Sequence, residues 1–118
     1  MEEKRRFTRI ACNNKAVVVI NNALIIDVNI LNISLNGALF ESTNEFIFRN
    51  EDKWQLTFKL PNSDINLQFE TEVVHSSGNR VGVKFIHMGL DTMIHLRSLL
   101  EARTSKPQEI ANELAFLT

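Results

Sequence analysis

The sequence predicts a mostly β protein: a six-stranded antiparallel β-barrel followed by a C-terminal helix and a short second helix in the tail. Three observations predict this fold class. From residue 16 onward apolar residues recur at every second position, which is the period of a strand with one buried face. Short turn-forming stretches separate these segments without a helix between them, and closure into a barrel removes the exposed edges of an open sheet. After Gly89 the apolar period becomes helical.

The first three predicted strands are short apolar runs. They are VVVI at 17–20, LIIDVNIL at 24–31 and ALF at 38–40. The stretch NNA at 21–23 separates the first two runs, and NG at 36–37 precedes the third. Asn-Gly is a strong hairpin signal because both residues tolerate a positive φ.

The next three predicted strands show the clearest alternation. Residues 54–60 and 65–73 each alternate apolar with polar side chains, and PNSD at 61–64 joins them. Because proline and small polar residues form turns, these two strands are expected to pair as an antiparallel hairpin. A sixth strand at 81–85 follows the turn-forming SSGN at 76–79.

Two helices are predicted at the C-terminal end of the chain. The first runs from residue 90 to about residue 103 and is long enough to plug the barrel mouth or lie across its side. Its apolar stripe consists of Leu90, Met93, Ile94, Leu96 and Leu100. TSKPQ at 104–108 interrupts the pattern, and a second helix is expected over 106–117. Its apolar face, Ile110, Leu114 and Leu117, must dock on its own domain or on a partner, so this helix also offers a homodimer surface.

The composition is that of one soluble globular domain. The 118 residues suffice to bury a core without disulfide or metal. No apolar run approaches the length of a membrane span, so no direct membrane insertion is expected. The N-terminal MEEKRRFTRI lacks an apolar signal-peptide core, and Cys12 is the only cysteine. We therefore expect a cytoplasmic protein.

Positive charge is concentrated in a basic arm, residues 1–15. Five cations against two carboxylates give this arm a formal charge of +3, and because the whole chain carries −1, the remaining residues carry −4. Proteins that bind DNA or RNA through phosphates usually present a basic face across the whole fold. A small anion suits this distribution better, so neither DNA nor RNA is the expected partner.

Two short segments are candidate functional motifs. They are RRFTR at 5–9, hereafter the RxxxR segment, and NISLNG at 32–37. Each is unremarkable alone, because a charge run is most often a solvated surface, and Asn, Ser and Gly commonly make turns. Their combination and order are far more informative than either segment by itself.

Together these segments resemble the signature of the PilZ family, bacterial receptors for the second messenger cyclic di-GMP. That signature is RxxxR on an N-terminal arm followed by [DN]xSxxG after a strand. Arg5 and Arg9 fill the first pattern, and Asn32, Ser34 and Gly37 fill the second.

The resemblance extends to about residue 103 and includes VGVKF at 81–85, which is similar to a GVxF-type strand of the family. It implies a PilZ-like domain over residues 1–103, with a helical tail at 104–118 outside it. It also implies a nucleotide-binding effector that acts on a downstream protein partner in motility, exopolysaccharide synthesis and biofilm formation, or pilus function. The resemblance implies no enzymatic activity and no cofactor besides the ligand.

The residue chemistry fits a ligand with two phosphates and two guanines. The guanidinium groups of Arg5 and Arg9 can bind phosphate bidentately, stack on a purine, or reach guanine O6 and N7. Arg6 is a lower-ranked third contact. We expect the basic arm to be mobile without ligand and to settle on the barrel once the phosphates neutralise it, which alters the surface offered to a partner.

On the barrel, three residues are expected to complete the site. The Asn32 amide offers a donor and an acceptor to a base edge, and the Ser34 hydroxyl can act as either. Gly37 allows a base to approach the backbone, or supplies a φ that other residues adopt only at a cost. Phe7 lies between the arginines and is expected to pack the arm against the barrel.

Other functions have weaker support. A barrel that binds single-stranded nucleic acid would use a basic groove with exposed aromatics, which the charge of −4 outside the arm disfavours. A ligand-independent protein-interaction domain of PilZ type is the nearer alternative, although such domains typically lack the arginine arm. His75, His87 and His95 lack the spacing of a metal site. Cys12 has no adjacent base in sequence, and no catalytic constellation is recognisable.

Overall fold

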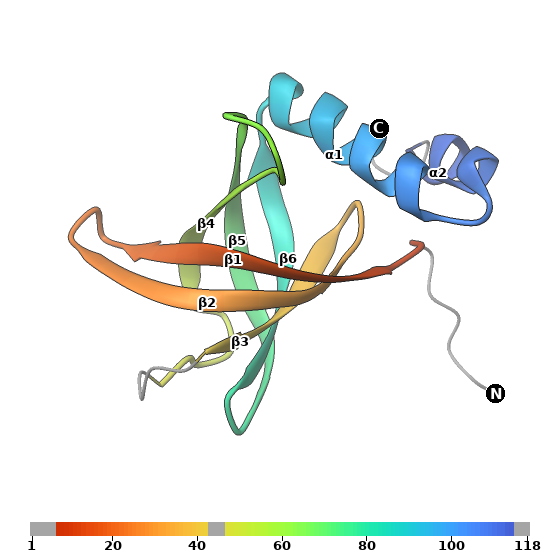
Figure 1. The fold of residues 1–118 in the computed structure, drawn as a ribbon. Coiled ribbons are helices and arrows are strands. Elements are labelled where there is room, and N and C mark those ends of the chain that lie inside the picture. Colours follow the sequence, from red (N-terminus) through yellow and green to blue (C-terminus); the bar gives the residue numbers. More distant parts are fainter. Residues whose placement is uncertain (1–6, 43–46, 115–118) are drawn as a thin grey trace, which may run out of the picture.

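The computed structural model describes residues 7–42 and 47–114. Six strands form one closed antiparallel barrel in the order β1-β2-β3-β6-β5-β4, and pairing of β4 with β1 closes it (Figure 1). Two helices follow. The fold class predicted from sequence is confirmed. The elements are β1 (Ile10–Ile20), β2 (Leu24–Ile33), β3 (Gly37–Ser42), β4 (Lys53–Lys59), β5 (Asn66–Ser77), β6 (Arg80–Met88), α1 (Leu90–Arg103) and α2 (Pro107–Leu114).

Strand β1 begins at Ile10, so the predicted start at residue 17 is wrong. Residues 10–15, which we assigned to the basic arm, belong to the barrel. Asn13 and Lys15 face outward and are exposed, as the outer face of a strand allows, but the half-buried position between them is the polar Asn14, and this interrupts the alternation. A register shift against β2 between Ala11 and Asn14 further obscures the pattern.

The barrel interior is filled by side chains from all six strands. Because successive strand residues point to opposite faces, alternate positions of each strand enter the core. Phe69 stacks on Phe85 with ring centroids 4.1 Å apart, and on Phe58 at 6.2 Å. The barrel residues that are at most 1% exposed include Val18, Ile26, Ile30, Ile33, Phe40, Leu56, Leu67, Phe69, Val73 and Val81.

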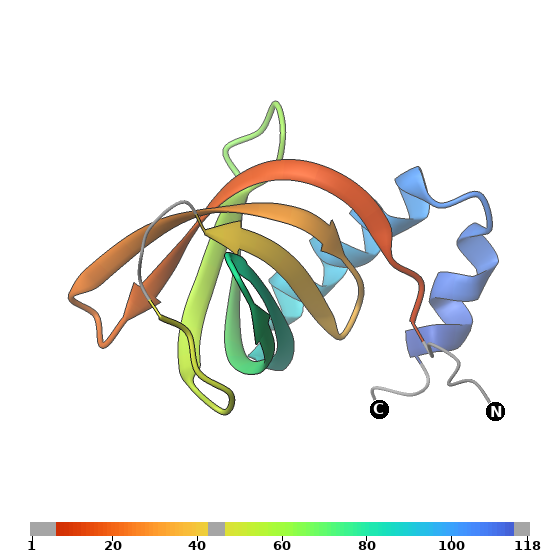
Figure 2. The ribbon, with the colours of Figure 1, turned by 90° about the horizontal axis from the view of Figure 1, so that it is seen from below.

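The β1–β2 hairpin determines where the two motif segments lie. Its turn is made by Asn21 and Asn22, which both have positive φ. Asparagine tolerates this conformation better than most residues. At the other end Ile10 pairs with Ile33. Figures 1 and 2 show this open end beside the helices, far from the turn. Residues just before β1 therefore lie opposite those just after β2.

Helix α1 packs on the barrel through a face that differs in part from the predicted stripe. Leu96 and Leu100 are fully buried as expected, but Leu90 is 75% exposed and Ile94 is 51% exposed. Thr92 takes the inward position in the first turn, where its hydroxyl oxygen accepts a hydrogen bond from the Gln68 backbone N–H at 3.4 Å. That bond satisfies a backbone donor of β5, which an apolar side chain could not do.

Helix α2 docks on its own chain. Ile110 is fully buried, and the helix packs against the end of α1 (Figure 1). This apolar position of the predicted dimer surface is thus already covered, and a homodimer stays a prediction. Leu117 and the end of the predicted 106–117 helix lie outside the described residues. In the described part of the chain, neither helix is long and apolar enough to cross a membrane.

Candidate functional site

The NISLNG segment forms the connection from β2 to β3. Asn32 and Ile33 end β2, and Gly37 begins β3. Leu35 is fully buried in the core and anchors the connection from within. The Asn36 carbonyl accepts a hydrogen bond from the Phe85 N–H of β6 at 2.8 Å. The segment is therefore held by the core on one side and by a neighbouring strand on the other.

Ser34 is the internal brace of this connection. Its side chain is fully buried, and its hydroxyl donates to Asn36 Oδ1 at 2.8 Å. The Ser34 hydroxyl oxygen also accepts a hydrogen bond from the Asn36 backbone N–H at 3.3 Å. The Ser34 backbone N–H donates to the Gly37 carbonyl at 2.8 Å. The hydroxyl thus satisfies local polar groups, which is the common role of serine in turns.

Gly37 is required by a close approach of two strands. A Cβ at this position would lie 2.4 Å from the Val83 carbonyl oxygen of β6, against which β3 pairs. Its φ is not positive, and neither is that of Asn36. The expected positive-φ hairpin turn at 36–37 is therefore wrong. The reason for a glycine at this position is steric, because only glycine lets the β6 backbone come this near.

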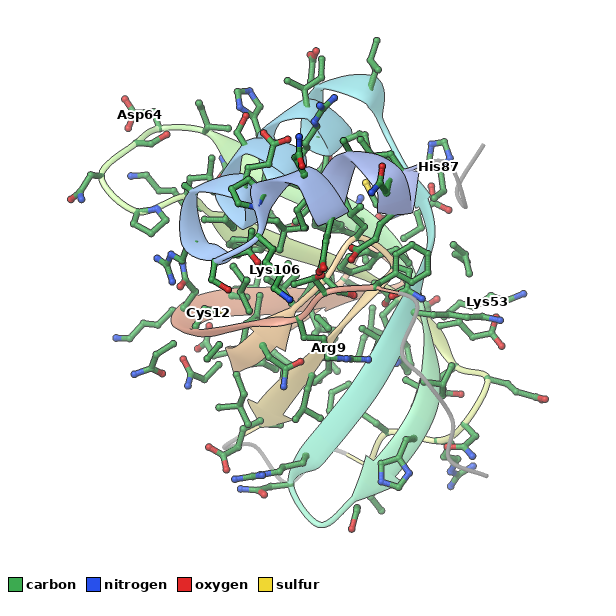
Figure 3. The ribbon with its side chains drawn as sticks, turned by 90° about the vertical axis from the view of Figure 1, so that its right-hand side faces the viewer. Arg9, Cys12, Lys53, Asp64, His87 and Lys106 are labelled. Carbon is green, nitrogen blue, oxygen red and sulfur yellow. The ribbon has the colours of Figure 1, made fainter. Side chains whose placement is uncertain are left out.

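Arg9 and Asn32 bring the two motif segments together. Arg9 Nη1 donates a hydrogen bond to Asn32 Oδ1 at 2.9 Å. Arg9 is exposed and Asn32 is half-buried, so both are within reach of a ligand in solvent. The contact follows from the hairpin register, in which Ala11 pairs with Asn32. Figure 3 shows Arg9 just ahead of β1, on the side of the molecule where α2 lies.

The rest of the RxxxR segment is described only in part. Arg5 and Arg6 lie outside the described residues. Phe7 is half-buried and packs against the core cluster, which contains residues of the barrel and of both helices.

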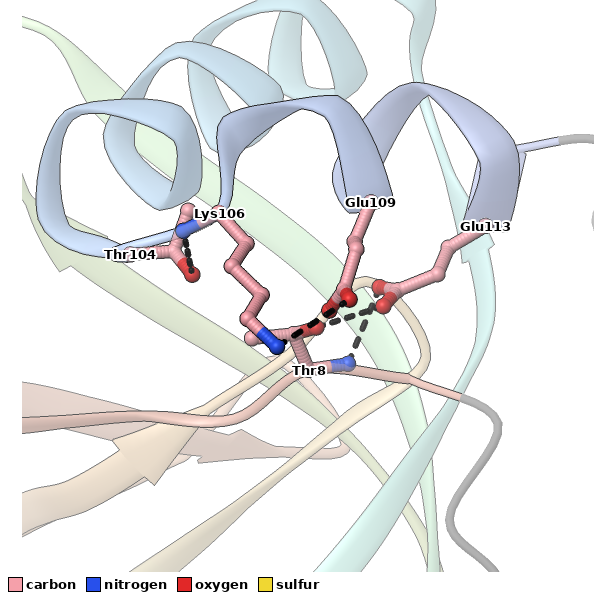
Figure 4. Close-up of polar contacts among 5 residues, drawn as sticks. All are labelled: Thr8, Thr104, Lys106, Glu109 and Glu113. Carbon is pink, nitrogen blue, oxygen red and sulfur yellow. Dashed lines mark hydrogen bonds and ion pairs between the residues drawn. The ribbon is translucent and has the colours of Figure 1, made fainter.

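Sequence reasoning missed a residue that contacts this segment. Glu113 of α2 accepts a hydrogen bond from the Thr8 N–H at 2.9 Å and a second from the Thr8 hydroxyl (Figure 4). A signal was present, because Glu113 falls three residues after Ile110 on the apolar face of an amphipathic helix. A carboxylate at such a position is rare unless it is paired.

The other candidate groups do not form a second site. His75 and His87 are exposed and His95 is half-buried, and no group of three potential metal ligands occurs among residues 7–42 and 47–114. Cys12 lies within β1, not before the first strand as expected, and its thiol faces the Ile30 carbonyl at 3.6 Å. Burial raises the pKa of the Cys12 thiol, with a smaller opposing effect of Arg103. A thiol that stays protonated at neutral pH is a poor nucleophile.

One family of known proteins matches the part of the chain that contains both the barrel and the motif segments. The family model described as PilZ domain matches residues 3–102. No match is found among curated proteins.

Several solved structures resemble the chain. The PilZ domain of YcgR from Escherichia coli, solved with c-di-GMP, superposes with a TM-score of 0.71 at 12% identity and covers 93% of this chain and 98% of that one. The PilZ domain of CeSA from a cellulose-synthesizing bacterium gives 0.65 at 12% identity, covering 80% and 96%. The Bacillus subtilis inhibitor of motility MotI/DgrA gives 0.70 at 15% identity over 87% of this chain. The match spans only 55% of the MotI chain.

Proposed function

The chain belongs to the PilZ domain family, and from that premise we propose that it is a receptor for cyclic di-GMP with its site at the open end of the β1–β2 hairpin. The hydrogen bond between Arg9 and Asn32 carries the proposal, because it joins the two motif segments at one place on the surface. The c-di-GMP in the E. coli YcgR PilZ domain supports this choice of ligand.

Arg9 is proposed as the central cation of the site. A guanidinium has five N–H donors, so Arg9 can bind a phosphate or the O6 and N7 of a guanine while it keeps its bond to Asn32. Bidentate contacts of this kind contribute about 1–3 kcal/mol each. Loss of Arg9 is therefore expected to weaken binding by about five- to 150-fold.

Asn32 is proposed to read a guanine edge. Its Oδ1 accepts from Arg9, and no hydrogen bond to any other described residue engages its Nδ2. That amide nitrogen can donate to the O6 or the N7 acceptor of guanine. The Arg9 bond also fixes the orientation of the amide, because the oxygen must face the guanidinium.

Ser34 and Gly37 are proposed to shape the site without contributing its main contacts. Ser34 is fully buried and bonded inside the connection, and Gly37 allows β3 to lie close to β6. Both residues are proposed to keep the β2–β3 connection in place, and with it the position of Asn32 at the end of β2. Their presence in the motif then has a structural cause as well as a functional one.

Arg5 and Arg6 are proposed to close over the bound ligand. Arg5 is four residues from Arg9, and a fully extended chain of that length spans at most about 14 Å. Phe7, Thr8 and Arg9 already contact the rest of the protein without ligand. The expected ordering of the arm is therefore proposed to act chiefly on the residues that precede them, and saturating ligand should slow amide exchange there.

The proposed output is a changed surface for a downstream protein partner. When the RxxxR segment closes over the ligand, its arginines pair with the phosphates and are no longer exposed as free cations. The surface charge that a partner meets is then changed. The likeness to a protein described as an inhibitor of motility supports a role in motility.

Titration calorimetry with cyclic di-GMP tests the proposal. The wild type, Arg9→Ala and Lys15→Ala are compared, with GTP as the control ligand. Lys15 is an exposed cation on β1, the strand that follows Arg9, so its replacement removes the same charge without touching the motif. We expect binding by the wild type and Lys15→Ala, and a loss of about five- to 150-fold for Arg9→Ala. A wild type that does not bind would favour the ligand-independent interaction domain instead.

A further inference from the structure

Glu113 of the tail helix α2 binds Thr8 of the RxxxR segment. Glu113 is only 8% exposed, and both of its carboxylate oxygens accept hydrogen bonds from Thr8, one from the backbone N–H and one from the hydroxyl. Thr8 lies between Arg5 and Arg9. Figure 4 shows the carboxylate reaching from α2 to the chain just ahead of β1.

The burial of Glu113 favours this contact when α2 is docked. A buried carboxylate is unfavourable unless hydrogen bonds replace its lost hydration. Thr8 supplies such bonds to both oxygens, while the fully buried Ile110 holds the helix in place one turn earlier. A docked α2 therefore places the carboxylate that fixes Thr8.

Fixation of Thr8 bears directly on Arg9. The two residues are adjacent and belong to no strand, so the position of Arg9 depends on what holds its neighbours. In the same structure in which Glu113 binds Thr8, Arg9 binds Asn32 at 2.9 Å. The docked helix and the Arg9–Asn32 hydrogen bond therefore occur together.

We propose that Glu113 is a positioning residue of the ligand site: by binding Thr8 it holds the adjacent Arg9 in the conformation that receives the ligand. The inference rests on the proposed function. It gives the tail, which lies outside the residues matched by the family, a part in binding: α2 pre-organises the site, so that less conformational entropy is lost when the ligand binds.

The test compares Glu113→Ala with Glu113→Gln and Glu109→Ala. Glutamine keeps the shape, and its amide can accept the Thr8 N–H and donate to the Thr8 hydroxyl. Glu109 is an exposed carboxylate one turn earlier on α2, paired with Lys106 at 3.9 Å, and its removal leaves Thr8 untouched. The readouts are cyclic di-GMP affinity by calorimetry, thermal midpoint, and exchange of the Thr8 amide without ligand.

Glu113→Ala is expected to weaken cyclic di-GMP binding by about five- to thirty-fold, the equivalent of ordering one backbone residue anew. It should also speed Thr8 amide exchange. Glu113→Gln should restore most of both, and Glu109→Ala should match the wild type. If Glu113→Ala fails to fold, Thr8→Val, which removes only the hydroxyl donor, is expected to weaken binding by a few-fold.

The outcomes separate this inference from the function on which it rests. Unchanged affinity in Glu113→Ala, or in Thr8→Val where Glu113→Ala does not fold, would overturn the positioning role while the receptor function stands. Equal weakening by Glu113→Ala and Glu109→Ala would also overturn it, because the effect would then be one of charge. A wild type that does not bind cyclic di-GMP would overturn both.

Discussion

Replacement of Gly37 by alanine tests the physical reason for the motif glycine. The added Cβ would lie 2.4 Å from the Val83 carbonyl oxygen, whereas ordinary contact begins at 3.4 Å. The strands β3 and β6 must therefore separate by about 1 Å at this point. The neighbouring atoms are backbone, so no flexible side chain can move aside to relieve the contact.

The expected loss of stability follows from two effects. Overpacking of this kind typically destabilises by about 1–3 kcal/mol. Separation also stretches the ladder where Gly37 pairs with Lys84, and each weakened hydrogen bond contributes about 0.5–1.5 kcal/mol. We therefore expect Gly37→Ala to lose about 2–4 kcal/mol of unfolding free energy, which lowers the thermal midpoint of a domain of this size by on the order of 10 °C.

Thermal unfolding followed by circular dichroism measures this effect, and Gly82→Ala is the matched control. Gly82 lies on β6, paired with Leu39 of β3, but a Cβ there would meet no atom closer than the His75 Cβ at 3.6 Å, which is ordinary contact. Gly82→Ala should be neutral or slightly stabilising, by up to about 1 kcal/mol. If Gly37→Ala instead melted with the wild type and lost only ligand affinity, the steric explanation would be refuted, and close approach of a base would explain the glycine.

Two further predictions concern buried groups. Ser34→Ala removes the hydroxyl that bonds Asn36 and should lower the urea midpoint by the equivalent of about 1–2 kcal/mol at unchanged m-value; an unaltered midpoint would show that the brace is unimportant. Burial raises the pKa of the Cys12 thiol, so the unfolded chain releases that proton first and stability should fall as pH rises above about 8.5. Cys12→Ala should flatten this decline, and equal alkaline slopes in both proteins would contradict the assignment.

The barrel could be predicted from sequence because most strands alternate cleanly. The exception is the first half of β1, where the half-buried Asn14 interrupts the apolar pattern that marks a strand. The error shortened β1 and lengthened the apparent arm. It did not affect the topology, because the β1–β2 turn at Asn21 and Asn22 was placed correctly.

The meeting of Arg9 and Asn32 was predictable from the ordered motifs, and the structure supplies the cause in the register of one hairpin. The reason for Gly37 was not predictable, because it depends on Val83 of β6, a strand distant in sequence. The contact of Thr8 with Glu113 joins opposite ends of the chain. Local sequence patterns do not show which residues distant in sequence will pair. The pattern of α2 does show that Glu113, a carboxylate on an apolar face, needs a hydrogen-bond partner.

Cyclic di-GMP is proposed to bind at the open end of the β1–β2 hairpin. The most direct measurement is a titration of ¹⁵N-labelled protein with cyclic di-GMP, followed by amide chemical shifts. The largest changes should fall on residues 5–9 and 32–37, while Asn21 and Asn22 at the far end of the hairpin stay unchanged. Shifts centred on that distant turn, or no shifts at saturating ligand, would contradict a site at the open end.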